Sequence, residues 1–141
     1  FTNNGAKQTS YFSKKNGAML KSFRKIKSNG KWNRYYFSKK NGAMLTSLRK
    51  IKTNGKWYRY YFSRKNGVML TGFRTLTVNG RKYKVYLSKK TGRMLTGWRK
   101  IKVNGKWHRY YFSKRTGSKM IGWHRINGRR HYFSKSGILI R

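Results

Sequence analysis

The chain has 141 residues, of which 38 are Lys or Arg and none is Asp or Glu, so its formal net charge is +38. A domain of this length and ordinary composition would carry roughly 15 to 20 carboxylates. Without them the chain has no acidic group for acid–base catalysis or metal binding, and the absence of Cys excludes disulfides and a thiolate nucleophile. The 17% share of Phe, Trp and Tyr argues against disorder. We therefore predict a folded, polycationic protein that is not an enzyme.

An aromatic motif recurs along the whole chain. Each copy is a Tyr followed by Phe or Leu and then Ser, and the copies begin at Tyr11, Tyr36, Tyr61, Tyr86, Tyr111 and Tyr132. Successive copies lie 25 residues apart, except the last, which follows after 21. A period of this size is typical of stacked arrays.

The period predicts that residues 1–141 form a single repeat array. Its units are a partial first unit (1–22), four full units (roughly 23–47, 48–72, 73–97 and 98–122) and a short last unit (123–141). Because the chain begins part-way through a unit, we expect it to be the C-terminal part of a larger protein.

Each unit after the first contains an Asn-Gly pair between segments with alternating side chains. The pairs begin at Asn29, Asn54, Asn79, Asn104 and Asn127. Asn-Gly favours a type I′ turn, which predicts an all-β protein made of successive two-stranded hairpins. The short last unit lacks two residues on each side of its turn, and this keeps every side chain on its original face.

A two-residue turn sets the register of each hairpin. In the unit around Asn104 it predicts one face with Trp98, Lys100, Lys102, Trp107, Arg109 and Tyr111. The other face carries Ile101, Val103, His108, Tyr110 and Phe112. The second face is more apolar, so we expect it to be the more buried one.

The same register places basic side chains opposite each other on the Trp-bearing face. The predicted pairs are Lys25 with Arg34, Lys50 with Arg59, Lys100 with Arg109 and Arg125 with Arg130, while Lys84 faces Thr75. Like charges in such positions destabilise a sheet by up to about 1 kcal/mol per pair. Their repetition therefore indicates that they bind an anionic partner.

Long segments of the chain resemble a known repeat family. "GWRKIKVNGKWHRYYFSKRTG", "GFRTLTVNGRKYKVYLSKKTGRMLTG" and "GWHRINGRRHYFSKSG" are similar to the cell-wall-binding repeats of Gram-positive surface proteins. This superfamily includes choline-binding repeats, the glucan-binding repeats of glucansucrases and the repeats of clostridial toxins. The resemblance implies a β-solenoid of hairpins with ligand sites between neighbouring units, which in the choline-binding branch are aromatic cages for a quaternary ammonium.

The family pattern can be carried over by position. Its Gly-Trp column corresponds to Phe23, Leu48, Phe73, Trp98 and Trp123, its second aromatic column to Trp32, Trp57, Lys82 and Trp107, and its Met column to Met19, Met44, Met69 and Met94. Leu48 and Lys82 interrupt the aromatic columns. The basic lining would repel a bare cation, so choline is disfavoured unless its phosphate is the part recognised.

A second departure concerns the residue after the aromatic triplet. The family's Asp is replaced here by Ser13, Ser38, Ser63, Ser88, Ser113 and Ser134. A hydroxyl can still cap the turn, although more weakly.

We predict two sets of ligand-binding residues. The set for a polyanion is Lys25, Arg34, Lys50, Arg59, Lys84, Lys100, Arg109, Arg125 and Arg130. The aromatic platform is Trp32, Trp57, Trp98, Trp107, Trp123, Tyr36, Tyr61 and Tyr111. Trp98 and Trp123 could instead pack between hairpins. His124 and His131 face each other and are either surface histidines or a pair of metal ligands. We expect no cofactor and no metal.

The first functional hypothesis is an attachment module on the bacterial surface that binds a phosphate- or carboxylate-bearing wall glycopolymer, such as a teichoic acid. A second is sequence-independent binding of nucleic acid, or binding of a sulfated or sialylated host glycan. A third is a structural repeat that forms a filament or binds an acidic partner. No apolar stretch is long enough for a membrane span, and we expect a secreted, surface-bound protein.

Overall fold

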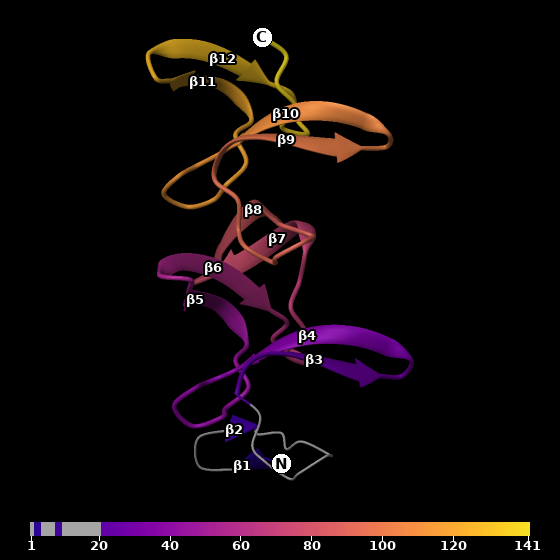
Figure 1. The fold of residues 1–141 in the computed structure, drawn as a ribbon. Helices are drawn as coiled ribbons and strands as arrows, with labels where there is room; N and C mark the ends of the chain where they lie inside the picture. Colours follow the sequence, from indigo (N-terminus) through magenta and orange to yellow (C-terminus); the bar gives the residue numbers. More distant parts are fainter. Residues whose placement is uncertain (1, 4–7, 10–20) are drawn as a thin grey trace. The chain divides into compact units, whose positions relative to one another are not determined.

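The computed structural model describes residues 2–3, 8–9 and 21–141 (Figure 1). The expectations for Tyr11, Ser13 and Met19 lie outside these residues. The described residues form twelve strands and no helix, in agreement with the all-β prediction. The antiparallel pairs are β1 (Thr2–Asn3) with β2 (Gln8–Thr9), β3 (Ser22–Ser28) with β4 (Lys31–Phe37), β5 (Ser47–Thr53) with β6 (Lys56–Phe62), β7 (Gly72–Val78) with β8 (Arg81–Leu87), β9 (Gly97–Val103) with β10 (Lys106–Phe112), and β11 (Gly122–Ile126) with β12 (Arg129–Phe133).

The strands belong to two compact units. Unit 1 is Phe1–Leu70 and contains β1 to β6, and unit 2 is Thr71–Arg141 and contains β7 to β12. Within unit 2, the tips of the β9–β10 and β11–β12 hairpins point to opposite sides of the view, and within unit 1 the same holds for β3–β4 and β5–β6 (Figure 1). The continuous solenoid through all the repeats stays a prediction.

The turns and the register agree with the sequence-based prediction. In the five hairpin turns, the Asn has φ of 51° or 52°, and the Gly that follows has φ between 77° and 81°. Positive φ at both positions defines the type I′ turn, whose twist matches that of the two strands. The resulting pairs include Lys25 with Arg34, Lys50 with Arg59 and Thr75 with Lys84. The predicted like-charge pairs therefore do lie opposite each other.

The apolar face of the hairpins is the buried one, as predicted. In β9–β10, Ile101, Tyr110 and Phe112 are 7%, 3% and 0% exposed, whereas Trp107 on the other face is 59% exposed. Such cores remain small, because each hairpin contributes only a few large side chains to them.

Each link between hairpins begins with a hydroxyl cap. In the first link, the Ser38 hydroxyl accepts hydrogen bonds from the backbone N–H of Lys40 (3.1 Å) and Asn41 (3.4 Å). Equivalent caps occur at Ser63, Ser88 and Ser113, whereas the Ser134 hydroxyl accepts from the backbone N–H of Ile138. The prediction that Ser can replace the family's Asp as a cap is confirmed at these positions.

Successive hairpins inside a unit are joined through the links. In unit 1, the backbone N–H of Met69 donates to the carbonyl of Arg34 (2.7 Å). In unit 2, Lys119 donates in the same way to Lys84 and Leu139 to Arg109, both at 2.8 Å. In these three cases the segment after one hairpin binds a strand of the hairpin before it, which brings residues 30 to 35 positions apart into contact.

Phe23 and Phe73 of the Gly-Trp column pack between neighbouring hairpins. The Phe23 ring lies 4.6 Å from Tyr36 of its own hairpin and 5.2 Å from Tyr60 of the next, measured between ring centroids. Phe73 repeats this arrangement with Tyr86 and Tyr110 in unit 2. Edge-on and tilted aromatic pairs of this kind each add roughly 0.5 to 1.5 kcal/mol.

Candidate functional site

A hollow of about 310 Å³ lies between the two long hairpins of unit 1. Hairpin β3–β4 and its link contribute Tyr36, Ser38, Lys39 and Leu45, and hairpin β5–β6 contributes Lys50, Ile51, Lys52 and Trp57. Three lysines, one tryptophan and one tyrosine therefore line the same space. We call this the first hollow.

A second hollow of about 240 Å³ occurs in unit 2 at related positions. Its lining includes Tyr86, Lys89, Ile101 and Lys102, which lie 50 residues after Tyr36, Lys39, Ile51 and Lys52. Phe73, Val103 and Asn104 complete it. Lysine and aromatic side chains thus line both hollows, but Trp107 and Lys100, the counterparts of Trp57 and Lys50, do not line the second.

The chemistry of these hollows suits an anion attached to a flat or apolar group. Trp57 is 59% exposed and offers an open face. Burial, followed by the neighbouring Tyr60 phenol, raises the pKa of Tyr36 above its ordinary value, so this group remains a neutral hydroxyl. The chain has no Asp or Glu to neutralise the lysines, and the hollow keeps a positive charge.

Several basic side chains lie over aromatic rings of their own hairpin. The guanidinium carbons of Arg109 and Arg130 are 4.9 Å from the Trp98 centroid and 4.6 Å from the Trp123 centroid. The Lys102 ammonium lies 5.9 Å from the Trp107 centroid. At these distances cation–π attraction is effective, so these cations and rings form single composite surfaces.

Similarities to known proteins agree with this arrangement. A family model described as "Putative cell wall binding repeat" matches residues 121–139. The structure of choline binding protein F from Streptococcus pneumoniae matches 99% of this chain with 32% identity and a TM-score of 0.74. In sequence and in fold the chain is thus similar to cell-wall-binding repeats.

A second pneumococcal structure, that of CbpJ, matches 99% of this repeat array with 27% identity and a TM-score of 0.72. The array spans about two fifths of the length of both solved chains, 41% in each case. A search of the curated proteins found none that matches. Among the described residues, no helix is long and apolar enough to cross a membrane.

The repeats bring some of the predicted site residues together. Lys50, Trp57 and Tyr36 line the first hollow, while Arg109 and Arg130 cover Trp98 and Trp123. The other predicted residues line neither hollow: these are Lys25, Arg34, Arg59, Lys84, Lys100, Arg125, Trp32, Trp98, Trp107, Trp123, Tyr61 and Tyr111.

The predicted aromatic platform is exposed only in part. Trp32, Trp107 and Trp123 are 62%, 59% and 51% exposed. Tyr36 and Tyr61 are only 8% and 9% exposed, because the returning link and the Gly-Trp column cover their strand. These two tyrosines can present an edge to a ligand, but not an open face.

Trp98 is half-buried, and it packs against Tyr111 and, in the next hairpin, His131, both at 5.1 Å between centroids. The alternative that this Trp packs between hairpins is therefore observed, together with its contact to Arg109.

Four lysines of the hollows were not among the predicted site residues: Lys39, Lys52, Lys89 and Lys102. Lys52 and Lys102 could have been found, because the predicted register already places them opposite Trp57 and Trp107. Lys39 and Lys89 recur at the same point of the link, 50 residues apart, which was a weaker signal.

His124 and His131 are register partners, as predicted. His124 Nε2 lies 2.8 Å from the Ile121 carbonyl, and the His131 ring packs against Trp98. No group of three or more potential metal ligands occurs in the described part of the chain. The two histidines are therefore engaged within the fold, one with the backbone and one with an indole.

Proposed function

We propose that this repeat array is an attachment module that holds a phosphate- or carboxylate-bearing wall polymer at the bacterial cell surface. The observation that carries the proposal is the first hollow, which Lys39, Lys50 and Lys52 line together with an exposed Trp57. Its counterpart in unit 2 has the same basic and aromatic character. A polymer with regularly spaced anions and sugar rings fits such repeated sites.

Repetition compensates for the weakness of each contact. An exposed ion pair contributes only about 0.2 to 1 kcal/mol in water. Once one polymer segment is bound, however, the next site binds intramolecularly at a high effective concentration. Attachment therefore depends on the number of repeats and decreases steeply with salt, because the contacts are screened.

Choline is a second candidate ligand, since the matching structure is named as that of a choline binding protein. In this chain, however, Arg109 and Arg130 already lie over Trp98 and Trp123. An external ammonium would compete with these internal cations for the same ring faces. We therefore infer that anionic groups contribute more to attachment than the ammonium does.

The proposal is tested by measuring retention of the chain on immobilised polymers at low and moderate salt. The polymers are a teichoic acid with and without choline, heparin, double-stranded DNA and a neutral glucan. Strong retention on choline-free teichoic acid that falls steeply with salt supports the proposal. Equal retention on every polyanion would remove its specificity for the wall, and tight, salt-insensitive retention on neutral glucan would contradict it.

A double variant tests the basic residues. Lys50→Ala with Lys52→Ala removes two lysines that line the first hollow, and should weaken teichoic acid binding roughly fivefold, from about 0.5 kcal/mol per charge. Lys56→Ala with Lys65→Ala is a charge-matched control, because both lysines are exposed and neither lines the first hollow. Equal losses in both variants would show that only net charge matters.

A further inference from the structure

The residue that bridges each link to its hairpin is apolar at every described position except one. These bridging residues are Met44, Met69, Met94, Lys119 and Leu139. In unit 1, Met69 is 7% exposed and belongs to the core with Tyr36, Tyr60 and Phe62. Lys119 therefore introduces a charge at a position that elsewhere completes a core.

The backbone holds Lys119 as it holds Met69. The N–H of Lys119 donates to the carbonyl of Lys84 at 2.8 Å, and that of Met69 to the carbonyl of Arg34 at 2.7 Å. The stem of Lys119 packs where Gly137 has no side chain, because a Cβ at Gly137 would collide with it. The position and direction of this lysine are therefore determined by the fold.

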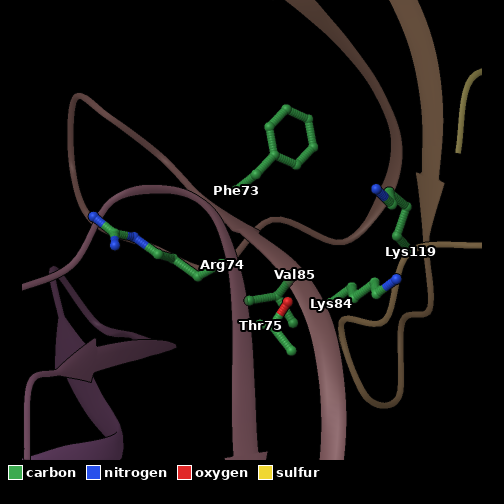
Figure 2. Close-up of a pocket in the computed structure, with 6 residues that line it drawn as sticks. All are labelled: Phe73, Arg74, Thr75, Lys84, Val85 and Lys119. Atoms are coloured by element: carbon green, nitrogen blue, oxygen red, sulfur yellow. The ribbon is translucent and has the colours of Figure 1, made fainter. Parts of the chain in front are cut away.

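The ammonium of Lys119 lies in a small recess of about 110 Å³, less than half the volume of either hollow. Figure 2 shows that Lys119 points toward the Phe73 ring and that Lys84 extends from its strand toward Lys119, whereas Arg74 points away. The Lys119 nitrogen lies 5.3 Å from the Phe73 centroid. We call this space, lined by Phe73, Arg74, Thr75, Lys84, Val85 and Lys119, the lysine recess.

The lysine recess has an uncompensated positive charge. Burial lowers the pKa of Lys119 from its ordinary value, and the like charge of Lys84 lowers it further. The chain contains no Asp or Glu that could offset these two ammonium groups. The arrangement costs stability unless an anion enters.

We propose that the lysine recess binds one phosphate group, held between the ammonium groups of Lys84 and Lys119 and resting against Phe73. Phosphate offers several acceptor oxygens, and lysine binds it as a point charge. A bound anion would relieve the repulsion between the two lysines, and the aromatic wall would contact the carbon atoms next to the phosphate. This inference rests on the proposed function, to which it adds a specific phosphate subsite.

Inorganic phosphate is the probe for the recess itself. Binding to the chain is followed by the NMR shifts of the backbone amides of Lys84, Thr75 and Lys119. We expect Lys119→Met, which restores the residue of the other links, to weaken phosphate binding at these amides about tenfold. Lys106→Met, an exposed lysine next to the β9–β10 turn, should change it less than twofold.

A Lys119→Met variant that binds phosphate at these amides as tightly as the unmodified chain would overturn the proposal. Lys119→Arg should retain binding, which separates the loss of charge from a change of shape. The melting temperatures of all variants show whether each has folded. Lys84→Met removes the other positive charge of the recess at a more exposed residue, where a substitution disturbs the fold less.

A glycerophosphodiester oligomer distinguishes polymer phosphate from the free ion. Weaker binding of both probes to Lys119→Met supports a subsite for wall polymers. If the array binds inorganic phosphate through Lys119 but is not retained on teichoic acid, the recess stands and the proposed attachment function fails. If teichoic acid retention is strong but identical in Lys119→Met and Lys106→Met, attachment stands and the recess is overturned.

Discussion

The guanidinium carbon of Arg109 lies 4.9 Å from the centroid of the Trp98 ring, so this hairpin covers one of its own aromatic faces with its own cation. Arg130 does the same for Trp123 in the next hairpin, at 4.6 Å. A contact of this kind contributes about 0.5 to 1 kcal/mol at an exposed site. An ammonium ligand that binds to the covered face of either ring must displace the arginine, whereas an anionic ligand can bind to the arginine and leave the ring contact in place.

Removing the covering arginine should therefore increase binding of small ammonium ions. We expect Arg109→Ala to bind tetramethylammonium about threefold more tightly near Trp98, since the competing cation–π contact is lost. Indole fluorescence measures the binding, and Lys106→Ala is the charge-matched control from the same hairpin. Identical affinities in both variants would mean that Arg109 does not compete for the ring.

Restoring acidic caps should stabilise the repeats and weaken their attachment. The Ser63 hydroxyl accepts hydrogen bonds from the N–H groups of Lys65 (3.1 Å) and Asn66 (3.4 Å), which a carboxylate would accept more strongly. We expect Ser63→Asp to raise the free energy of unfolding by about 0.5 to 1 kcal/mol. Urea unfolding measures this change.

The same replacement should lower the salt concentration at which the chain leaves a teichoic acid column, and acidic replacements at Ser38, Ser88 and Ser113 should lower it further. Ser63→Ala is the control, which loses the cap and should lower stability without altering the charge. If Ser63→Asp left attachment at its original strength, the absence of acidic residues would have no role in binding.

The strand starts contain a backbone position that glycine tolerates best. Ser22 and Ser47 have φ of 71°, and their counterparts Gly72, Gly97 and Gly122 have φ between 76° and 82°. A residue with a Cβ is strained there by roughly 1 kcal/mol. Gly97→Ser should therefore destabilise unit 2 by about that amount. No steric clash adds to this strain, because the new Cβ would lie 3.7 Å from Lys114 Cε, an ordinary contact distance.

Ser47→Gly should relieve this strain. Because glycine also loses more backbone entropy on folding, the net stabilisation should be smaller, about 0.5 kcal/mol. The variant also loses the long 3.4 Å hydrogen bond from Arg64. Thermal melting of the two variants gives the comparison. Opposite signs support backbone strain, and a stabilising Gly97→Ser change would refute it.

The lowered pKa of Lys119 predicts a dependence of stability on pH. In the folded chain this pKa lies below the ordinary value of 10.5, so between the two values the unfolded chain binds more protons. The contribution of Lys119 to stability should therefore rise with pH as the pH passes from the folded pKa toward 10.5. The destabilising effect of the buried charge is fully present below that window.

This effect is measured as the difference in the free energy of unfolding between the unmodified chain and Lys119→Met, from neutral pH to about pH 10.5. Taking the difference cancels the opposite effect of Tyr36 and Tyr110, whose pKa values burial raises. As the pH rises, the free energy of unfolding of the unmodified chain should increase relative to that of Lys119→Met. Added phosphate should move this increase to higher pH, because an anion favours the charged lysine.

The hairpins could be predicted from the sequence because their determinants are local. Asn104 and Gly105 adopt the two positive φ values that a type I′ turn needs, and the turn then determines that Lys100 faces Arg109. The alternation of side chains predicts which face is apolar, as Ile101 and Phe112 confirm. No distant contact is required for these conclusions.

The binding surfaces required the tertiary structure. The sequence places Tyr36 and Tyr61 on the Trp-bearing face, but it does not show that the links cover them. The sequence also predicts Lys52 opposite Trp57, but not that Tyr36 and Lys39 of the preceding hairpin close a hollow around them. These contacts depend on how each link returns across the preceding hairpin.

The sequence by itself determined the repeat, the turns, the register and the excess of positive charge, since turn propensity and side-chain alternation act over a few residues. Only the tertiary structure showed that Lys119 lies beside Lys84 and over Phe73. A link hydrogen bond joins residues 84 and 119, and packing against Gly137 directs the lysine stem. Such proximity results from chain folding over long sequence distances, which no local pattern encodes.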